Sequence, residues 1–336
     1  MIEPKFQSVI AKYIDNYLEE CRLIRHSLDR TKSLLSKFDA FLVNEGVTSE
    51  CITLDIFERW VDTFRNLLCE RTIYHHRSEV ILLLEYMRSI GVQCEVPRRA
   101  PFKIKPFIPY IFTEKEMQDI FRICDSWRDK CHKPEGALMA MPLFLRILYS
   151  TGMRYSEVAN LKNKDVDLRQ HTIRIIETKN GCERIAPINS SLTLCIEQYL
   201  KYRGQLPITG LDAPDAYFIV NHKGRRLCHT TFNFRFHKII KEAHVKGNNP
   251  KTICRIHDIR HTSCVHVMHK LIKEGRDLYT CIPAISAFMG HKSIFSTELY
   301  MRFTAEMFPE MVQMSEDVTA PISDVISNAL KNEDDE

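Results

Sequence analysis

Six residues between positions 154 and 300 carry side chains that together could transfer a phosphoryl group. They are Arg154, Lys179, His257, Arg260, His291 and Tyr300. Two arginines can clamp the non-bridging oxygens of a phosphodiester, because the guanidinium fork matches phosphate geometry and keeps its charge. A tyrosine hydroxyl can attack phosphorus and carry it as a covalent ester. A lysine can protonate the departing oxygen, while histidines can move the nucleophile's proton or hold the phosphate.

This set neutralises a phosphate without a metal ion. The chain has no H-E-x-x-H motif, no Cys/His cluster and no P-loop. We therefore expect no metal site and no cofactor.

Each residue also has a simpler explanation when it is taken alone. Arg154 could pair with Glu157 one helical turn later, and Lys179 could be a solvated turn residue. His257 could cap a helix, and Tyr300 could belong to the core. Only the combination of the six points to chemistry.

The elements that must hold these residues are mainly helical. In the first hundred residues, apolar periodicity predicts helices over 27–46, 53–68 and 72–92, with Thr53 as an N-terminal cap. Residues 96–109 then contain four prolines and four basic residues, a composition that prevents a continuous helix. We predict a helical N-terminal domain over residues 1–104 and a linker over 105–112.

The catalytic chemistry lies in a second domain, predicted over residues 113–312. Thr113 and Glu116 form a capping box, and two helical stretches over 143–161 are broken at Gly152. Residues 171–188 alternate β-branched side chains around Asn180-Gly181, which predicts a β-hairpin. Beyond the hairpin the pattern is helical to about residue 310. The fold class is therefore mainly α with a small antiparallel sheet or hairpin.

The C-terminal segment, residues 313–336, differs in its sequence pattern from the domain before it. "TAPISDVISNAL" has apolar residues at helical spacing, but such a helix is too short to be stable alone, and the "KNEDDE" that follows is acidic. We predict an amphipathic helix that docks on a protein surface, followed by a disordered tail.

Composition narrows the class of protein. The chain has 336 residues, 44% hydrophobic and 27% charged, which suits two globular domains. No apolar run approaches the ~18 residues of a membrane span, no leader precedes the first helix, and 12 cysteines are scattered without C-x-x-C pairs. We expect a cytoplasmic protein with free thiols. Residues 111–312 hold 30 basic and 21 acidic side chains, a net charge of +9 that favours a polyanionic partner.

Three stretches resemble the motifs of the tyrosine recombinases, the phage integrase family. "LYSTGMRYSEVANLKNKDVDL" resembles the first-arginine box, "HDIRHT" the H-x-x-R-H box, and "FMGHKSIFSTELYM" the G-H that precedes the nucleophilic tyrosine. The resemblance spans residues 5–312. It implies that Tyr300 is the nucleophile and that Glu157 braces the first arginine. It also implies the rest of the catalytic shell: Arg154, Lys179, His257, Arg260 and His291.

The resemblance also implies a fold and partners. The implied fold is the tyrosine-recombinase catalytic fold, in a two-domain chain that closes as a C-shaped clamp around double-stranded DNA. The implied assembly is a homotetramer on two specific recombination sites. Strand exchange would pass through a 3′-phosphotyrosine and a four-way junction, with no cofactor and no membrane. The C-terminal helix could link protomers in trans or fold back in cis, and accessory DNA-binding factors could assist.

Several functions stay open within and beside this family. The segment between Arg260 and His291 is longer than in compact members, which favours integration, excision or transposition of a mobile element over a Xer-like dimer resolvase. A type IB topoisomerase shares the chemistry but needs no partner site, and the G-H box and the apolar tail helix disfavour it. A non-catalytic DNA-binding regulator is disfavoured by the complete set of six residues.

Basic residues outside these motifs are candidates for contacts to DNA phosphates. In the helix predicted over 230–245, four apolar residues form a buried stripe and basic residues fall opposite. The candidates are Arg71, His75, Arg77, Arg225, Arg226, Arg235 and Lys238.

Overall fold

The computed structural model describes residues 6–24, 28–99, 108–129, 138–176, 181–247, 254–293, 297 and 300. The chain divides into two compact units, residues 1–107 and 108–336. Part of the predicted linker, the hairpin turn with Lys179, and the C-terminal helix and tail lie outside the described residues. No helix in the described part is both long and apolar enough to cross a bilayer.

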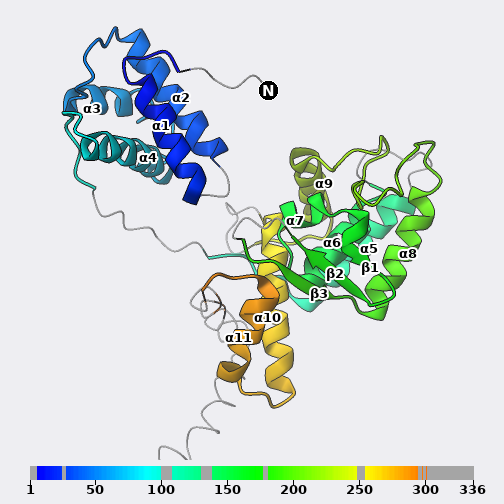
Figure 1. Ribbon diagram of the computed structural model, residues 1–336. Coiled ribbons are helices and arrows are strands. Elements are labelled where there is room, and N and C mark those ends of the chain that lie inside the picture. Colours follow the sequence, from blue (N-terminus) through cyan, green and yellow to red (C-terminus); the bar gives the residue numbers. More distant parts are fainter. Residues whose placement is uncertain are drawn as a thin grey trace, which may run out of the picture. The chain divides into compact units, whose positions relative to one another are not determined.

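The first unit consists of helices. They are α1 (Ala11–Ile24), α2 (Asp29–Asn44), α3 (Leu54–Asp62) and α4 (Glu70–Ser89) (Figure 1). Their apolar faces meet in one core, in which Phe38, Trp60 and Leu84 are at most 3% exposed. The predicted cap is confirmed, because the Thr53 side chain accepts a hydrogen bond from the Ile56 amide.

One predicted helix of this unit is too long. The apolar pattern over 53–68 predicts a helix to residue 68, but α3 ends at Asp62. The following amides of Thr63, Phe64 and Arg65 bond to carbonyls only three residues earlier. These tighter turns redirect the chain toward α4, a change that the apolar spacing alone does not reveal.

The second unit contains a longer series of elements. They are α5 (Glu114–Asp129), α6 (Met141–Thr151), α7 (Tyr155–Asn160), the 3₁₀ turn η1 (Asn163–Asp165), β1 (Val166–Asp167), β2 (Thr172–Ile175), β3 (Arg184–Pro187), α8 (Ser190–Arg203), α9 (His229–Glu242), α10 (Ile256–Lys273) and α11 (Leu278–Met289). Thr113 and Glu116 exchange the hydrogen bonds of the predicted capping box. The buried stripe of α9 is also as predicted: Phe232, Phe236, Ile239 and Ile240.

The strands form an antiparallel sheet in the order β1-β2-β3 (Figure 1). Ile173 pairs with Ala186, and Ile175 pairs with Arg184. The mainly helical fold with a small antiparallel sheet is therefore confirmed, and β1 adds a strand to the predicted hairpin.

Helix α6 is the centre of the second unit. It packs against α5, α8 and α10, while α11 packs against α10 and against β3 (Figure 1). Its core residues Phe144, Leu145 and Ile147 are fully buried. The predicted break follows α6 directly, because Gly152 adopts φ = +58°, which only glycine adopts without cost. The chain therefore turns sharply into α7 at the position of Arg154.

The prediction of continuous helix beyond the hairpin is wrong for residues 204–228. This segment consists of turns and two isolated bridges, Lys162 to Tyr217 and Val220 to Arg226. It contains Pro207 and Pro214, and glycines with positive φ at 210 and 224. Prolines and left-handed glycines both prevent regular helix.

Candidate active site

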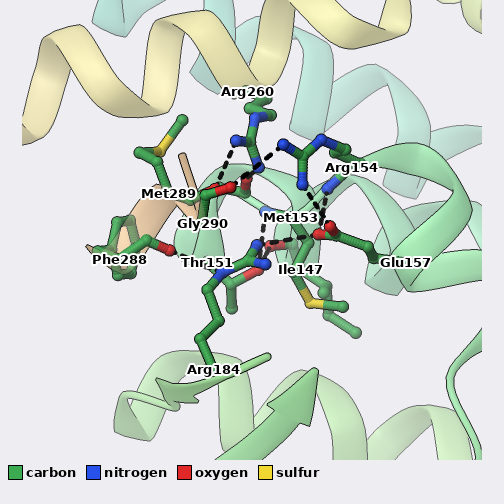
Figure 2. Close-up of polar contacts among 11 residues, drawn as sticks. Ile147, Thr151, Met153, Arg154, Glu157, Arg184, Arg260, Phe288, Met289 and Gly290 are labelled. Carbon is green, nitrogen blue, oxygen red and sulfur yellow. Dashed lines mark hydrogen bonds and ion pairs between the residues drawn. The ribbon is translucent and has the colours of Figure 1, made fainter. Parts of the chain in front are cut away.

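The two predicted arginines meet at the turn between α6 and α7 (Figure 2). Arg260, on α10, is only 2% exposed and donates hydrogen bonds to the carbonyls of Gly152 and Met289. Arg154 donates from Nη2 to the carbonyl of Gly290 over 3.3 Å. The turn after α6 and the end of α11 are therefore joined by both guanidinium groups.

Glu157 braces Arg154, as predicted from the resemblance. Its Oε1 accepts from Arg154 Nη1 over 2.7 Å, and its Oε2 accepts from the Arg154 amide over 2.9 Å. The carboxylate is buried, with 2% of the side chain exposed. Burial raises its pKa, but the hydrogen bond and charge of Arg184, together with Arg154, outweigh burial and leave the pKa below its usual range. Glu157 is thus ionised at neutral pH.

Charge in this cluster is not balanced. Arg154, Arg184 and Arg260 face one carboxylate, Glu157, so the cluster has a net charge of +2. Burial, and then the charge of Arg154, lower the pKa of Arg260 to about 10, which still leaves it protonated at neutral pH. A buried excess of guanidinium charge is an environment that attracts an anion.

Tyr300 lies beside this cluster and is 5% exposed. Its hydroxyl shares a 2.6 Å hydrogen bond with Nδ1 of His261, and its ring stacks on His291 at a centroid distance of 5.8 Å. Burial raises the pKa of the Tyr300 hydroxyl, while the charges of Arg260 and Arg154 lower it only in part. The hydroxyl is therefore neutral at pH 7 and needs a proton acceptor to become a nucleophile.

The histidines around Tyr300 are unprotonated at neutral pH. Burial and then the charges of Arg260 and Arg154 lower the pKa of His291 to about 4, and Nδ1 of this ring lies 2.8 Å from Oγ1 of Thr297. Burial and then the neighbouring His257 lower the pKa of His261 to about 3.

His257 is more exposed to solvent than these two rings, although the surrounding protein still removes part of its hydration. Its ring lies edge-on to His261 at a centroid distance of 4.9 Å. Desolvation by the surrounding protein and then the charge of Arg260 lower its pKa to about 4.

Five of the six predicted catalytic residues thus come together around one site. Contacts through Met289, Gly290 and His261 link these five: Arg154, His257, Arg260, His291 and Tyr300. Lys179 lies outside the described residues. The simpler explanation for Arg154, an ion pair with Glu157, is what the structure shows, and the catalytic role of Arg154 stays a prediction.

The sequence did not single out two residues of this site, Arg184 and His261. His261 stands four residues after His257 in the quoted "HDIRHT" box, on the same face of a helix, which is a signal that could have identified it. Arg184 follows the hairpin turn and carries no motif signal.

The predicted DNA contacts are distributed over both units of the chain. Arg71 and His75 are exposed on α4, while Arg77 is half-buried in an ion pair with Glu58 of 2.9 Å. In the second unit, Arg225, Arg226 and Lys238 are exposed and Arg235 is half-buried. The Nη1 of Arg226 donates to Asn160, and the Nζ of Lys238 lies over the ring of Phe234.

Known proteins are similar to this chain in sequence and in fold. The profile of the phage integrase family matches residues 111–307. The tyrosine recombinase XerC of Roseiflexus castenholzii is 33% identical over 205 residues, which cover 61% of this chain and 58% of the relative. The tyrosine recombinase XerA of Pyrococcus horikoshii is 26% identical over 295 residues, which cover 83% and 92%.

A solved structure gives the same fold. The Tn1549 transposon integrase, in complex with a circular intermediate DNA, has a TM-score of 0.60 at 16% identity, covering 89% of this chain and 99% of that one. The family match extends over more than half of the chain and includes every described residue of the site. The chain therefore belongs to the phage integrase family and is a tyrosine site-specific recombinase, an enzyme that cleaves and rejoins DNA strands.

Proposed function

We propose that the chain binds double-stranded DNA and cleaves one strand by attack of the Tyr300 hydroxyl on a phosphodiester. The observation that carries the proposal is the placement of this hydroxyl: it lies 2.6 Å from a neutral histidine and beside a buried cluster of net positive charge. A phosphate bound by Arg154 and Arg260 would sit next to the tyrosine oxygen.

The reaction then follows from the chemistry of these groups. The Tyr300 oxygen forms a bond to phosphorus, and the bond from phosphorus to the 5′ oxygen breaks, leaving a 3′-phosphotyrosine and a 5′-hydroxyl. The phenolic proton passes to a neutral histidine, with His261 the nearest acceptor. The leaving oxygen takes its proton from Lys179, a role that rests on the resemblance. The reverse steps rejoin the strand.

The arginines stabilise the charge that develops on the non-bridging oxygens. Arg260 is held by two backbone carbonyls, and Arg154 is held by a buried carboxylate, so neither side chain must reorganise when phosphate arrives. Preorganised charge in a site of low polarity is worth more than the same charge in water. The remaining donors on both guanidinium groups can face the phosphate.

We assign the DNA backbone contacts to the predicted basic residues. Arg71, Arg225 and Lys238 are exposed, which suits contacts that set affinity and salt dependence. Arg77 is the weakest candidate because Glu58 already engages it. Loss of one phosphate contact should reduce the salt slope of binding by about one.

We further propose a helical N-terminal domain over residues 1–104, a linker over 105–112 and a catalytic domain over 113–312, closing as a C-shaped clamp on DNA. The active assembly would be a homotetramer on two sites, linked in trans by the C-terminal helix, in the cytoplasm. The likeness to a transposon integrase supports a role in moving a genetic element.

A Xer-like resolvase is the second candidate, supported by the similarity to XerC and XerA. Supercoiled plasmids with two element-end sites or with two chromosomal sites would separate these roles. Recombination of element ends supports the mobile-element role, and recombination of chromosomal sites alone supports the resolvase. Relaxation of a plasmid without any site would instead support the topoisomerase alternative.

The experiment that tests the cleavage reaction uses nicked suicide substrates built from DNA flanking the gene. Wild type should form a denaturation-resistant protein–DNA adduct, and Tyr300→Phe should bind DNA but form none. Tyr149→Phe is the matched control, because Tyr149 is half-buried and its hydroxyl also lies within hydrogen-bond distance of a histidine, 2.7 Å from Nδ1 of His266. An adduct with Tyr300→Phe would refute the assignment of the nucleophile.

A further inference from the structure

Arg184, the first residue of β3, has an unusual position for an arginine in a strand. Its side chain is 7% exposed, while the next residue, Ile185, is 65% exposed. Alternate residues of a strand point to opposite faces, so this strand buries the charged side chain and exposes the apolar one. A buried guanidinium is costly unless specific partners hold it.

The partners of Arg184 are two parts of the active site (Figure 2). Its Nη2 donates to Oε2 of Glu157 over 2.9 Å, and its Nε donates to the carbonyl of Phe288 over 2.8 Å. Glu157 holds Arg154 with its other oxygen. Phe288 lies in the last turn of α11, two residues before the glycine whose carbonyl accepts from Arg154.

The glycine at the end of α11 makes room for this arginine. Gly290 has φ = +64°, and a Cβ at this position would lie 2.7 Å from Nη1 and 3.0 Å from Cζ of Arg184. The guanidinium therefore packs directly beneath the turn that leads into His291. Within the described residues, Nη1 is buried and has no hydrogen-bond partner, so the group's charge is only partly compensated.

We propose that Arg184 is a positioning residue for the cleavage reaction: it fixes the Glu157 carboxylate relative to the end of α11, and thereby sets Arg154 and His291 around one phosphate. This inference rests on the proposed function. Arg184 is too buried to touch DNA, so its effect passes through Glu157 and the Gly290 turn. A single side chain from the sheet thus joins both walls of the phosphate site.

The first test compares Arg184→Gln and Arg184→Lys with wild type on the suicide substrate. Arg184→Gln should slow single-turnover cleavage about 100-fold, because a misplacement of about 1 Å costs that much. Its Kd for the same DNA should stay within about threefold, since no contact to DNA is lost. Arg184→Lys keeps the charge but cannot reach both partners at once, so its cleavage rate should lie between those of wild type and Arg184→Gln.

The matched control is Arg174→Gln, the arginine of the neighbouring strand β2. Its side chain is 58% exposed and lies 3.9 Å from Asp165, outside the site. It should cleave within about twofold of wild type. Equal cleavage by Arg184→Gln and Arg174→Gln would overturn the inference.

A double variant tests the route through Glu157. If Arg184 acts through this carboxylate, Arg184→Gln combined with Glu157→Gln should cleave no more slowly than the slower single variant. Multiplied losses would overturn this route. Thermal unfolding of each variant separates a lost fold from a misplaced site, and Arg184→Lys, which keeps the buried charge, remains informative if Arg184→Gln unfolds.

A substrate with a bridging 5′ sulfur completes the test, because a thiolate leaves without being protonated. This substrate should restore cleavage by Lys179→Ala but leave Arg184→Gln slow. Restoration of Arg184→Gln would mean that Arg184 serves the leaving group, and the inference would fail. Absence of any wild-type adduct at Tyr300 would instead refute the proposed function, so the two failures are distinguishable.

Discussion

Replacement of Glu157 by glutamine should destabilise the second unit by about 3–5 kcal/mol, the usual cost of breaking a buried ion pair from one side. The carboxylate compensates two guanidinium groups, Arg154 at 2.7 Å and Arg184 at 2.9 Å, and its side chain is only 2% exposed. Glutamine keeps the shape but turns a net charge of +2 in the cluster into +3. Its amide group would also face a guanidinium donor.

The assay is urea unfolding at pH 7, followed by circular dichroism. Asp125→Asn is the matched control in the same unit, because Asp125 also pairs with an arginine, Arg146 at 2.7 Å, but is 43% exposed. Solvent screens such a pair, so its loss should cost about 1 kcal/mol or less. If Glu157→Gln proves as mild as Asp125→Asn, the carboxylate's charge is not what holds the arginines, and the electrostatic account of the site is wrong.

Two further predictions concern the turn after α11 and the response to acid. Gly290→Ala should lower the free energy of unfolding and also slow cleavage as Arg184→Gln does, because the added Cβ would displace the Arg184 guanidinium. The control is Gly275→Ala, at a position with φ = +75° and no atom within 4 Å of the added Cβ. It should lower the free energy of unfolding by only about 1 kcal/mol and leave single-turnover cleavage unchanged. The pKa of His261 in the folded chain is about 3, below the ordinary value of 6.5. Below pH 6.5 the unfolded chain therefore binds a proton that the folded chain excludes, so the folded state loses stability as pH falls. Urea unfolding should show that this ring lowers the free energy of unfolding by about 2 kcal/mol between pH 7 and pH 5, and His261→Gln should remove that part of the decrease. If the variant shows the same dependence of unfolding free energy on pH as wild type, a neutral buried ring is contradicted.

Local signals in the sequence predicted much of the fold. The caps at Thr53 and Thr113 and the break at Gly152 are each decided within four residues, by side-chain bonds to amides or by a positive φ. The buried stripe of α9 follows from helical periodicity alone. Such features depend on neighbours in the chain, so reading the chain is enough to find them.

The brace formed by Arg184 depends on partners that are distant in the chain. It bonds to Glu157, 27 residues earlier, and to Phe288, 104 residues later. The inner face of its strand therefore holds this guanidinium beside the fully buried Ala186, while Ile185 on the other face is 65% exposed. Alternation of apolar side chains cannot reveal that a charged residue shares the inner face.

His261 illustrates the same limit within a motif. The motif order predicts Tyr300 as the nucleophile, but the hydrogen bond of its hydroxyl joins residues 39 apart in the chain. Helical spacing places His261 beside His257, yet nothing in the spacing says which of the two rings lies against the tyrosine. Only the packing of α10 against the segment after α11 decides it.

The net charge of the site also explains how the substrate could prepare its own reaction. Before DNA binds, burial and then the charges of neighbouring groups hold the pKa of His291 at about 4 and that of His261 at about 3, so each ring is a weak acceptor for the phenolic proton. A phosphate anion about 6 Å from a ring would contribute about 3 kcal/mol at an effective dielectric constant of about 20, which raises the pKa of a histidine by about 2. The same anion neutralises part of the excess charge on Arg154 and Arg260. A bound phosphate would therefore make both rings better proton acceptors, but it would also raise the pKa of the nearby Tyr300 hydroxyl. It promotes transfer of the phenolic proton only to the extent that it lies closer to the histidine ring than to the phenolic oxygen.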